Sequence, residues 1–325
     1  MPPRLSSDPK SEWIGTLHRA VIAAVGIGLA FGVQSAVAAA AATSRAVTDD
    51  LSRKVLVPPA PLRIVSLAPG ATEMLFAAGA GGQLIATVEY ASEPAAARRI
   101  PRIGDVAAID MERLVALRPD VVVAWPAGGN PAQRQKIAAL GIPLYDQQVE
   151  RLAGLAASLR RLGVHAGSEP LAARAADELE ARLIALERAY SAGAWGAGRR
   201  PSVLLQVWNR PIYTVGGRHL MSDALSICGA RNVFADLPEP GPVVDTEAVI
   251  ARNPDIIIAA GPSGETAAWV ADWRRFATLE AVQHQRVVAF EDQALSRLGP
   301  SVIDATEELC RTIVRLGGGG SGGGS

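Results

Sequence analysis

The sequence predicts an α/β protein with two Rossmann-like lobes, whose parallel-rich sheets are joined by one long, rigid α-helix. Its 325 residues are too many for one compact core, which indicates about two domains. Short, wholly apolar segments alternate with segments of helical periodicity, as in β-α units. One arrangement of these segments also occurs twice, once in each half of the chain.

The repeat is clearest where a short helix precedes an apolar strand. A helix beginning near Glu112 ends before a Pro-Asp pair and leads into the apolar segment 121–125. A second helix, beginning near Glu247, ends before another Pro-Asp pair and leads into 256–259. Continuous runs of Val and Ile without polar alternation are typical of parallel strands covered on both faces. Each half is therefore expected to hold its own parallel sheet.

A second pair of segments repeats the order of strand, cap and helix. Segment 63–67 is expected to form a buried strand, and Thr72 to cap a helix that ends at Gly79. Segment 202–208 is the corresponding strand in the second half, where Ser222 is expected to cap the helix that follows.

Between the halves lies a stretch of helical periodicity, with Glu and Arg on the faces that are not apolar. It is expected to connect the lobes once, as a stiff hinge, and a cleft between two lobes is a usual place for a small-molecule site. The expected order is a signal peptide at 1–38, an N-terminal linker at 39–60, an N-terminal α/β lobe at 61–148, an interlobe helical segment at 149–192, a C-terminal α/β lobe at 193–316, and an appended Gly/Ser linker at 317–325.

The N-terminus has the features of a secretory signal. Basic residues precede an apolar run at 20–33, which is too short to span a bilayer comfortably, and 36–38 supply a small-x-small cleavage site. A buried N-terminal helix is the alternative interpretation. No cysteine lies near the cleavage site, so we expect an unlipidated protein of the periplasm.

Composition argues against several functional classes. Lys+Arg and Asp+Glu both number 32, so there is no basic field to hold nucleic acid. Neither the two cysteines nor the four histidines have metal-ligand spacing. No nucleophile elbow, Walker loop or zinc helix is present, so we expect no catalytic residues, no catalytic cofactor and no enzyme activity. Cys228 is a conceivable nucleophile, but in an oxidising compartment pairing with Cys310 is favoured.

Glu112 and Glu247 occupy equivalent places in the two halves. Each begins a helix, where a carboxylate offsets the helix dipole by a few tenths of a kcal/mol, and that role alone can explain it. The functional interpretation is a pair of carboxylates that contacts a two-fold symmetric partner with a basic patch for each lobe.

Several motifs together resemble those of a known family. They are 64–69 with Thr72-Glu73, 111–120, Ala124-Trp125 with 128–130, and Cys228-Gly229 with 232–234. On these residues, from 63 to 316, the chain resembles the vitamin B12-binding periplasmic proteins of ABC importers. They belong to the helix-hinged (class III) binding proteins, which also carry haem and iron siderophores.

The resemblance implies a carrier that captures cobalamin, or a related corrinoid, in the interlobe cleft and delivers it to an inner-membrane ABC transporter. The corrinoid is then a transported ligand and not a cofactor, and the carrier is a monomer. In the family, a glutamate of each lobe docks onto arginines of the two permease subunits, which work with ATPase subunits. The matching positions are Glu112 and Glu247 for docking, Cys228 and Cys310 for a disulfide, and Tyr90, Trp125 and Tyr213 for the ligand. Trp208 and Asn209 lie on the same loop as Tyr213 and are weaker candidates for lining the cleft.

A haem or siderophore carrier of the same class is the alternative function. Haem calls for an axial ligand, for which Tyr90, Tyr213 or His219 are candidates. A siderophore site is expected to gather cationic residues, and Arg210 and Arg218 are the candidates.

The chain also departs from the family pattern. It has Val106, and the proline-rich stretch 238–242, where the family often has tryptophans. The sequence therefore leaves the preferred corrinoid open. Trp269 and Trp273 lie at helical spacing and are expected to be packing residues.

Overall fold

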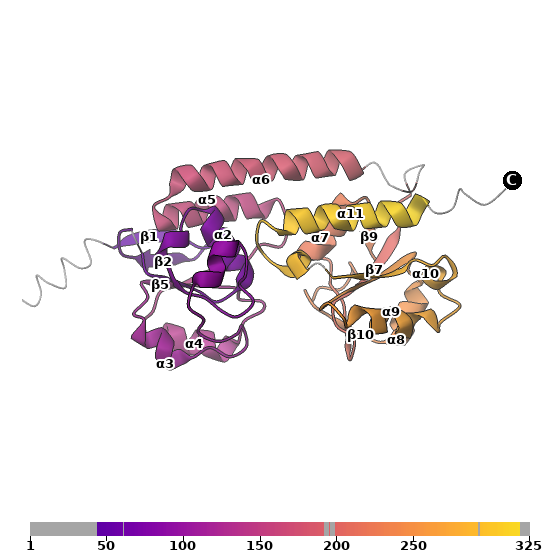
Figure 1. Ribbon diagram of the computed structural model, residues 1–325, viewed down its shortest axis with the longest axis horizontal. Coiled ribbons are helices and arrows are strands. Elements are labelled where there is room, and N and C mark those ends of the chain that lie inside the picture. Colours follow the sequence, from indigo (N-terminus) through magenta and orange to yellow (C-terminus); the bar gives the residue numbers. More distant parts are fainter. Residues whose placement is uncertain (1–43, 61, 192–194, 196–198, 292, 319–325) are drawn as a thin grey trace, which may run out of the picture. The chain divides into compact units, whose positions relative to one another are not determined.

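The computed structural model describes residues 44–318, apart from 61, 192–194, 196–198 and 292. Both α/β lobes belong to one compact unit, which begins at Ala46 (Figure 1). The predicted signal peptide at 1–38 lies outside the described residues. Within the described part of the chain, every helix is too short or too polar to cross a membrane.

The first lobe is built on a four-stranded parallel sheet. Its strands are β3 (Ile64–Ser66), β4 (Leu84–Ala86), β5 (Val121–Ala124) and β6 (Leu144–Asp146), in the order β4-β3-β5-β6. The helical elements of this lobe are α2 (Pro69–Ala77), η1 (Gly81–Gln83), η2 (Ala95–Arg99), α3 (Met111–Ala116) and α4 (Pro131–Ala139).

The second lobe repeats this topology. Its parallel strands are β7 (Ser202–Gln206), β9 (Arg231–Asn232), β11 (Ile256–Ala260) and β12 (Val287–Phe290), in the order β12-β11-β7-β9. A short antiparallel pair, β8 (Ile212–Tyr213) and β10 (Val243–Val244), lies outside this sheet. The helical elements are α7 (Leu220–Ile227), α8 (Thr246–Arg252), α9 (Thr266–Arg274), α10 (Glu280–Gln283), η3 (Gln293–Ser296) and α11 (Val302–Gly318). The predicted fold class is confirmed.

Both faces of each sheet are covered, which explains the continuous apolar runs. In β5, Val121 and Val123 belong to a core cluster that includes side chains of α2, while Val122 and Ala124 belong to a second cluster that includes Leu114 of α3. Successive side chains of a strand point to opposite faces, so a strand buried on both faces needs apolar residues at every position. The same division between two clusters occurs in β11.

The predicted interlobe segment forms two helices, α5 (Gly154–Ala166) and α6 (Glu169–Tyr190). Figure 1 shows α6 running above both lobes, so the chain passes from one lobe to the other through it. The buried residues of α6 form a single stripe at helical spacing: Ala172, Ala176, Leu179, Leu183 and Leu186. They belong to a core cluster shared by both lobes, which makes this connection stiff.

The predicted linker at 39–60 is wrong where the structure describes it. Strands β1 (Arg45–Thr48) and β2 (Lys54–Val57) form a two-stranded sheet there. Val47, Val55 and Val57 are buried in the main core cluster. Their alternation with exposed residues is the signal of a half-buried hairpin, and the charged residues between them obscured it. At the other end, α11 continues to Gly318, so the predicted linker at 317–325 begins inside that helix.

Two predicted helix caps are also wrong. Helix α2 begins at Pro69, three residues before Thr72, because proline suits the first position of a helix. The Thr72 hydroxyl instead bonds inside the lobe to Ser66 and Thr87. Helix α7 begins at Leu220, and the cap is His219, not Ser222.

The predicted disulfide is confirmed. Cys228 follows α7 and Cys310 lies within α11, with their sulfur atoms 1.99 Å apart. Both residues are fully buried, and the bridge joins positions separated by 82 in sequence. It therefore attaches the last helix to the body of the second lobe.

Candidate ligand-binding cleft and docking surface

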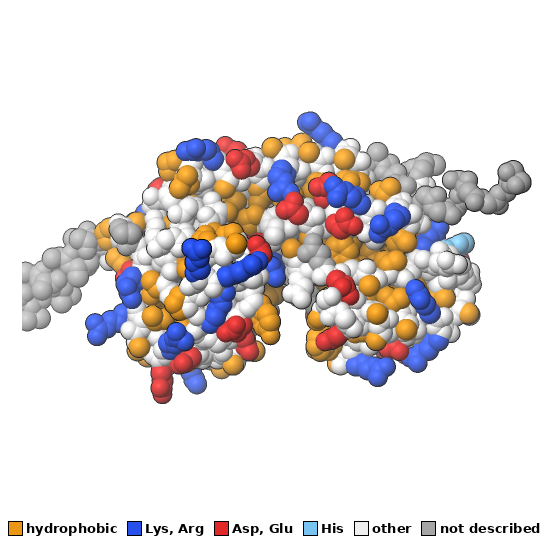
Figure 2. Space-filling model, in the orientation of Figure 1, with side chains coloured by type: hydrophobic (Ala, Val, Ile, Leu, Met, Phe, Trp, Pro, Cys, Tyr) orange, Lys and Arg blue, Asp and Glu red, His pale blue; other side chains and the backbone are white. Residues whose placement is uncertain are grey.

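A cavity of about 550 Å³ lies between the two lobes, at the carboxyl ends of their strands. Trp125 follows β5 directly, Gln147 follows β6, and Val207 follows β7. Ligands of open α/β sheets bind at this edge, because the loops that follow the strands converge there. Figure 2 shows the opening between the lobes, with hydrophobic side chains along both rims.

The first lobe contributes two aromatic side chains to this cavity. Trp125 is partly buried, and Tyr90 is 76% exposed. The backbone of Tyr90 has a φ of 64°, in the left-handed region that costs a non-glycine residue free energy. The loop therefore holds Tyr90 in an unfavourable conformation at the cavity.

Gly128 determines where the Trp125 ring can lie. A Cβ atom at position 128 would stand 1.9 Å from the nearest ring carbon. The backbone of Gly128 therefore packs directly against the indole, and any side chain there would displace the ring. This contact explains why a glycine follows the tryptophan at this distance.

The second lobe contributes Trp208, whose ring packs against the buried ring of Trp269. The Trp208 and Trp269 rings meet edge to face, with centroids 6.3 Å apart. Trp269 in turn packs on Gly261, where an added Cβ would lie 2.4 Å from the ring. Trp269 and Trp273 are both buried, as expected for packing residues, and the Trp273 indole donates to Gln206 at 2.6 Å.

The segment that follows β12 provides the remaining side of the cavity. Arg297 lines the cavity and forms an ion pair with buried Glu73 of α2, 3.5 Å away. The Glu73 carboxylate also accepts hydrogen bonds from the hydroxyl and the backbone N–H of Ser301. The second lobe is thus in direct polar contact with the first at this side of the cavity.

Two of the predicted ligand residues lie outside this lining. Asn209 lines a separate hollow of about 550 Å³ on the second lobe, where its amide donates to Asp272. That hydrogen bond lowers the pKa of Asp272. Tyr213 lies in β8, opposite Val243 of β10, and is half exposed. The structure brings Tyr90, Trp125 and Trp208 together, and Val106 joins them in the lining.

The two predicted docking glutamates have the same local structure. Glu112 in α3 and Glu247 in α8 each lie in the first turn of a short helix and are exposed. Their helices are capped by Asp110 and Asp245, whose carboxylates accept backbone N–H groups at 2.9 Å and 2.7 Å. Figure 1 shows α3 and α8 on the side of the lobes opposite to α6.

The carboxylates of Glu112 and Glu247 form no hydrogen bond or ion pair with the described residues, so both can receive a partner's cation. Glu247 also borders the hollow that contains Asn209, whose apolar lining includes Ile212 and Phe276. A partner side chain that reaches Glu247 therefore has an adjoining recess.

Of the residues predicted for haem or siderophore binding, Tyr90 lines the cavity, whereas Arg210, Arg218 and His219 are engaged elsewhere. Arg210 pairs with Asp272, and Arg218 pairs with Glu150 at 2.8 Å. His219 caps α7 by accepting the Met221 N–H at its Nδ1, and burial lowers its pKa to about 4. Arg210, Arg218 and His219 all lie outside the lining of the interlobe cavity, as far as the described residues define it. Among the same residues, His, Cys, Asp and Glu side chains form no cluster of three or more that suits a metal ion.

Residues 64–294 match the model of a family described as periplasmic binding protein, and this range covers both sheets and most of the cavity lining. The chain belongs to this family of periplasmic binding proteins.

Relatives of the chain cover most of its length. It is 34% identical over 255 residues to the vitamin B12-binding protein of Photorhabdus laumondii, covering 78% of this chain and 88% of the relative. It is 33% identical over 249 residues to that of Vibrio cholerae, covering 76% and 87%. The crystal structure of the periplasmic vitamin B12-binding protein BtuF of Vibrio cholerae matches with a TM-score of 0.70 and 32% identity, over 80% of this chain and 99% of that chain. The haem-binding protein RhuT of Roseiflexus, 24% identical with a TM-score of 0.67, shares the fold.

Sequence reasoning missed several residues of the cavity in this periplasmic binding protein. Gln147 and Val207 directly follow strands, so the carboxyl-edge rule was the signal that could have found them. Arg297 and Met221 carry no comparable signal, because one lies in an irregular loop and the other in the first turn of a helix.

Proposed function

We propose that this periplasmic binding protein captures cobalamin, or a related corrinoid, in the interlobe cavity and delivers it to an inner-membrane ABC transporter. The observation that carries the proposal is the aromatic cavity at the carboxyl edges of both sheets, in a chain about one-third identical to vitamin B12-binding proteins. On this proposal the chain is exported by its signal peptide, acts as an unlipidated periplasmic monomer, and performs no catalysis.

The physical argument concerns the shape of the ligand. A flat, rigid macrocycle offers large apolar faces, and aromatic side chains bury such faces with few rotamers to freeze. Tyr90 and Trp125 of one lobe and Trp208 of the other line the same cavity. A corrinoid held among them would contact both lobes.

Absorbance and calorimetric titrations test the ligand. The chain without residues 1–38 is titrated with cyanocobalamin and, in parallel, with haemin. We expect one-to-one binding of cyanocobalamin and a weak haemin response. A tight haemin complex with a tyrosinate-type spectrum, together with no cobalamin binding, would move the protein to the haem carriers and make Tyr90 the first residue to replace.

Two matched aromatic variants test the site. Tyr90→Ala removes a ring that lines the cavity, whereas Tyr213→Ala removes a half-exposed ring that lies outside the lining. We expect the first to weaken corrinoid binding about tenfold, which corresponds to about 1.4 kcal/mol, and the second to have little effect. The opposite order would place the ligand outside this cavity.

Docking is proposed to depend on Glu112 and Glu247, which would contact arginines of the two permease subunits. The double variant Glu112→Ala, Glu247→Ala should bind ligand like the wild type but associate poorly with its transporter in nanodiscs. The control replaces Glu169 and Glu178, two exposed glutamates of α6, by alanine. Equal loss of docking in the control, or loss of ligand binding in the double variant, would refute the docking assignment.

A further inference from the structure

Gln147 belongs to the lining of the interlobe cavity and connects the two lobes. It follows β6 directly, its backbone N–H donates to Ala124 at 2.8 Å, and its side chain is fully buried. Its Nε2 donates to the backbone carbonyl of Leu298 in the second lobe at 2.9 Å. Because that carbonyl only accepts, the nitrogen of the amide must face it, and the orientation of the side chain is settled.

The other end of this amide has no partner within the described part of the chain. The Gln147 Oε1 is buried and accepts no hydrogen bond from the described residues. Most buried polar atoms are hydrogen-bonded, and an unsatisfied acceptor destabilises the folded state. Gln147 belongs to the cavity lining, but its Oε1 has almost no accessible surface, so the lining must shift before a ligand donor reaches it. A donor on a ligand is the chemistry that would then satisfy this oxygen.

The charge of the cavity points to the same kind of ligand. Arg297 is the one charged side chain among the described lining residues, and buried Glu73 neutralises it from 3.5 Å. The cavity lining therefore combines a compensated cation, Arg297, with an unsatisfied acceptor, the Gln147 Oε1. A neutral ligand edge that carries N–H donors suits this combination, whereas an anionic edge without donors does not.

We infer that Gln147 selects for a macrocycle with neutral primary carboxamides at its edge, by accepting a hydrogen bond from an amide N–H through Oε1. This rests on the proposed corrinoid function and names the feature of the ligand that is recognised. Corrinoids carry acetamide and propionamide groups, which donate. The propionates of haem are carboxylates at neutral pH, and a carboxylate beside Oε1 would bring two acceptors together.

The test compares two ligands on two proteins. Cyanocobalamin and its monocarboxylate isomers, in which one peripheral amide is hydrolysed to an acid, are titrated against the wild type and against Gln147→Met. Methionine keeps the length of the side chain and removes both polar atoms. We expect at least one isomer to bind the wild type about tenfold more weakly than cyanocobalamin, and this ratio to fall to near one in Gln147→Met.

The ratio separates recognition from structural damage. Loss of the bond to Leu298 can loosen the cavity, but loosening weakens both ligands alike and leaves their ratio unchanged. The control is Gln283→Met, which removes an exposed glutamine that also donates to a backbone carbonyl, and it should keep the wild-type ratio.

Two results would overturn the inference while leaving the proposed function intact. One is that every monocarboxylate binds the wild type as tightly as cyanocobalamin. The other is that Gln147→Met discriminates between the ligands as strongly as the wild type. If the wild type binds no corrinoid at all, the proposed function itself fails, and the inference fails with it.

Discussion

Glu73 of α2 accepts a hydrogen bond of 2.5 Å from the hydroxyl of Ser301, immediately before α11, and this bond crosses from one lobe to the other. The Glu73 carboxylate is 5% exposed. A second bond crosses nearby, from Gln147 to the Leu298 carbonyl. The lobes are therefore joined both through α6 and through a polar contact beside the cavity.

Removing the Ser301 hydroxyl should weaken this contact. We expect Ser301→Ala to lower the free energy of unfolding by about 2 kcal/mol, because a hydrogen bond to a buried carboxylate is lost while the carboxylate stays. Urea unfolding measures the loss, and hydrogen exchange should quicken around 293–301. Ser263→Ala, which removes an exposed bond to Glu291, should cost clearly less. Equal losses of unfolding free energy in the two variants would mean that the interlobe bond stabilises the protein no more than an exposed hydrogen bond does.

Gly128→Ala should impair binding through Trp125. The new methyl group would overlap the indole ring, so the ring must leave its place in the cavity wall. We expect cobalamin affinity to fall about tenfold or more and the tryptophan fluorescence to shift. Gly82→Ala is the matched control, since a Cβ there meets nothing within 4 Å. Unchanged affinity in Gly128→Ala would show that the position of Trp125 is unimportant.

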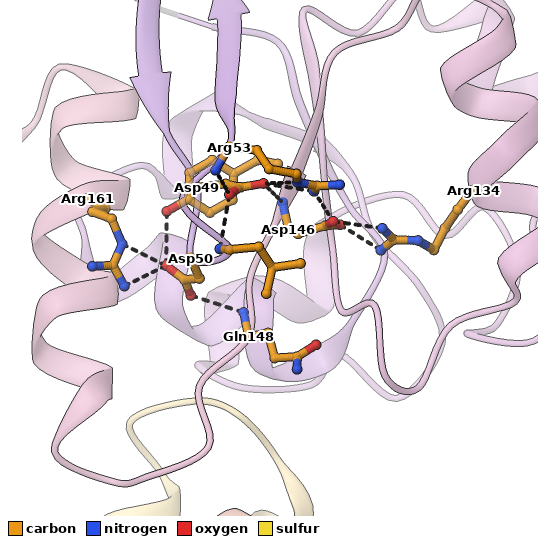
Figure 3. Close-up of polar contacts among 9 residues, drawn as sticks. Asp49, Asp50, Arg53, Arg134, Asp146, Gln148 and Arg161 are labelled. Carbon is orange, nitrogen blue, oxygen red and sulfur yellow. Dashed lines mark hydrogen bonds and ion pairs between the residues drawn. The ribbon is translucent and has the colours of Figure 1, made fainter. Parts of the chain in front are cut away.

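Asp50 should be essential to the stability of the first lobe (Figure 3). Its fully buried carboxylate accepts hydrogen bonds from Arg161 at 2.9 Å, Ser158 at 2.7 Å and the Gln148 N–H at 3.0 Å. Asp50→Ala leaves these donors unpaired and should cost about 3–5 kcal/mol. Asp177→Ala, which breaks an exposed pair with Arg160, should cost less than about 1 kcal/mol.

Denaturant unfolding of both variants measures this difference. The same network continues through Asp49 and Asp146, which are also buried and pair with Arg53 and Arg134 (Figure 3). A loss below 1 kcal/mol in Asp50→Ala would mean that the hairpin contributes little to the fold.

His219 should make stability depend on pH. Burial lowers its folded-state pKa from 6.5 to about 4, so the unfolded state binds the proton more readily. The contribution of neutral His219 to the free energy of unfolding is therefore fully present above pH 6.5. It is lost as the pH falls toward 4, which lowers the free energy of unfolding by on the order of 2–3 kcal/mol. His219→Asn keeps a capping side chain but does not titrate, so it should remove this component.

The measurement is the difference in unfolding free energy between the wild type and His219→Asn at several pH values. His284→Asn, which replaces an exposed imidazole, is the control. An identical pH dependence in the wild type and His219→Asn would contradict the prediction.

Much of the fold was predictable because it depends on local patterns. The Val and Ile runs before Trp125 and after Asp255 have the composition of strands buried on both faces, and the structure places them there. The disulfide was predictable because the chain has only two cysteines. The β1–β2 hairpin was missed because its buried valines are few and charged residues lie between them. Those charges are paired with Asp146 and Arg161, and because these partners are distant in sequence, no local pattern indicates the pairing.

The sequence by itself determined the two-lobe α/β architecture, the helical connection between the lobes and the two equivalent glutamates, since each follows from periodicity, capping or repetition along the chain. Only the tertiary structure decided which side chains share the cavity. Trp208 lines the cavity and Tyr213 does not, although their backbones are bridge partners. The Trp208 ring packs against Trp269, whereas Tyr213 pairs with β10. Gln147 and Arg297 are far apart in sequence and meet only where the two sheets present their carboxyl edges to each other.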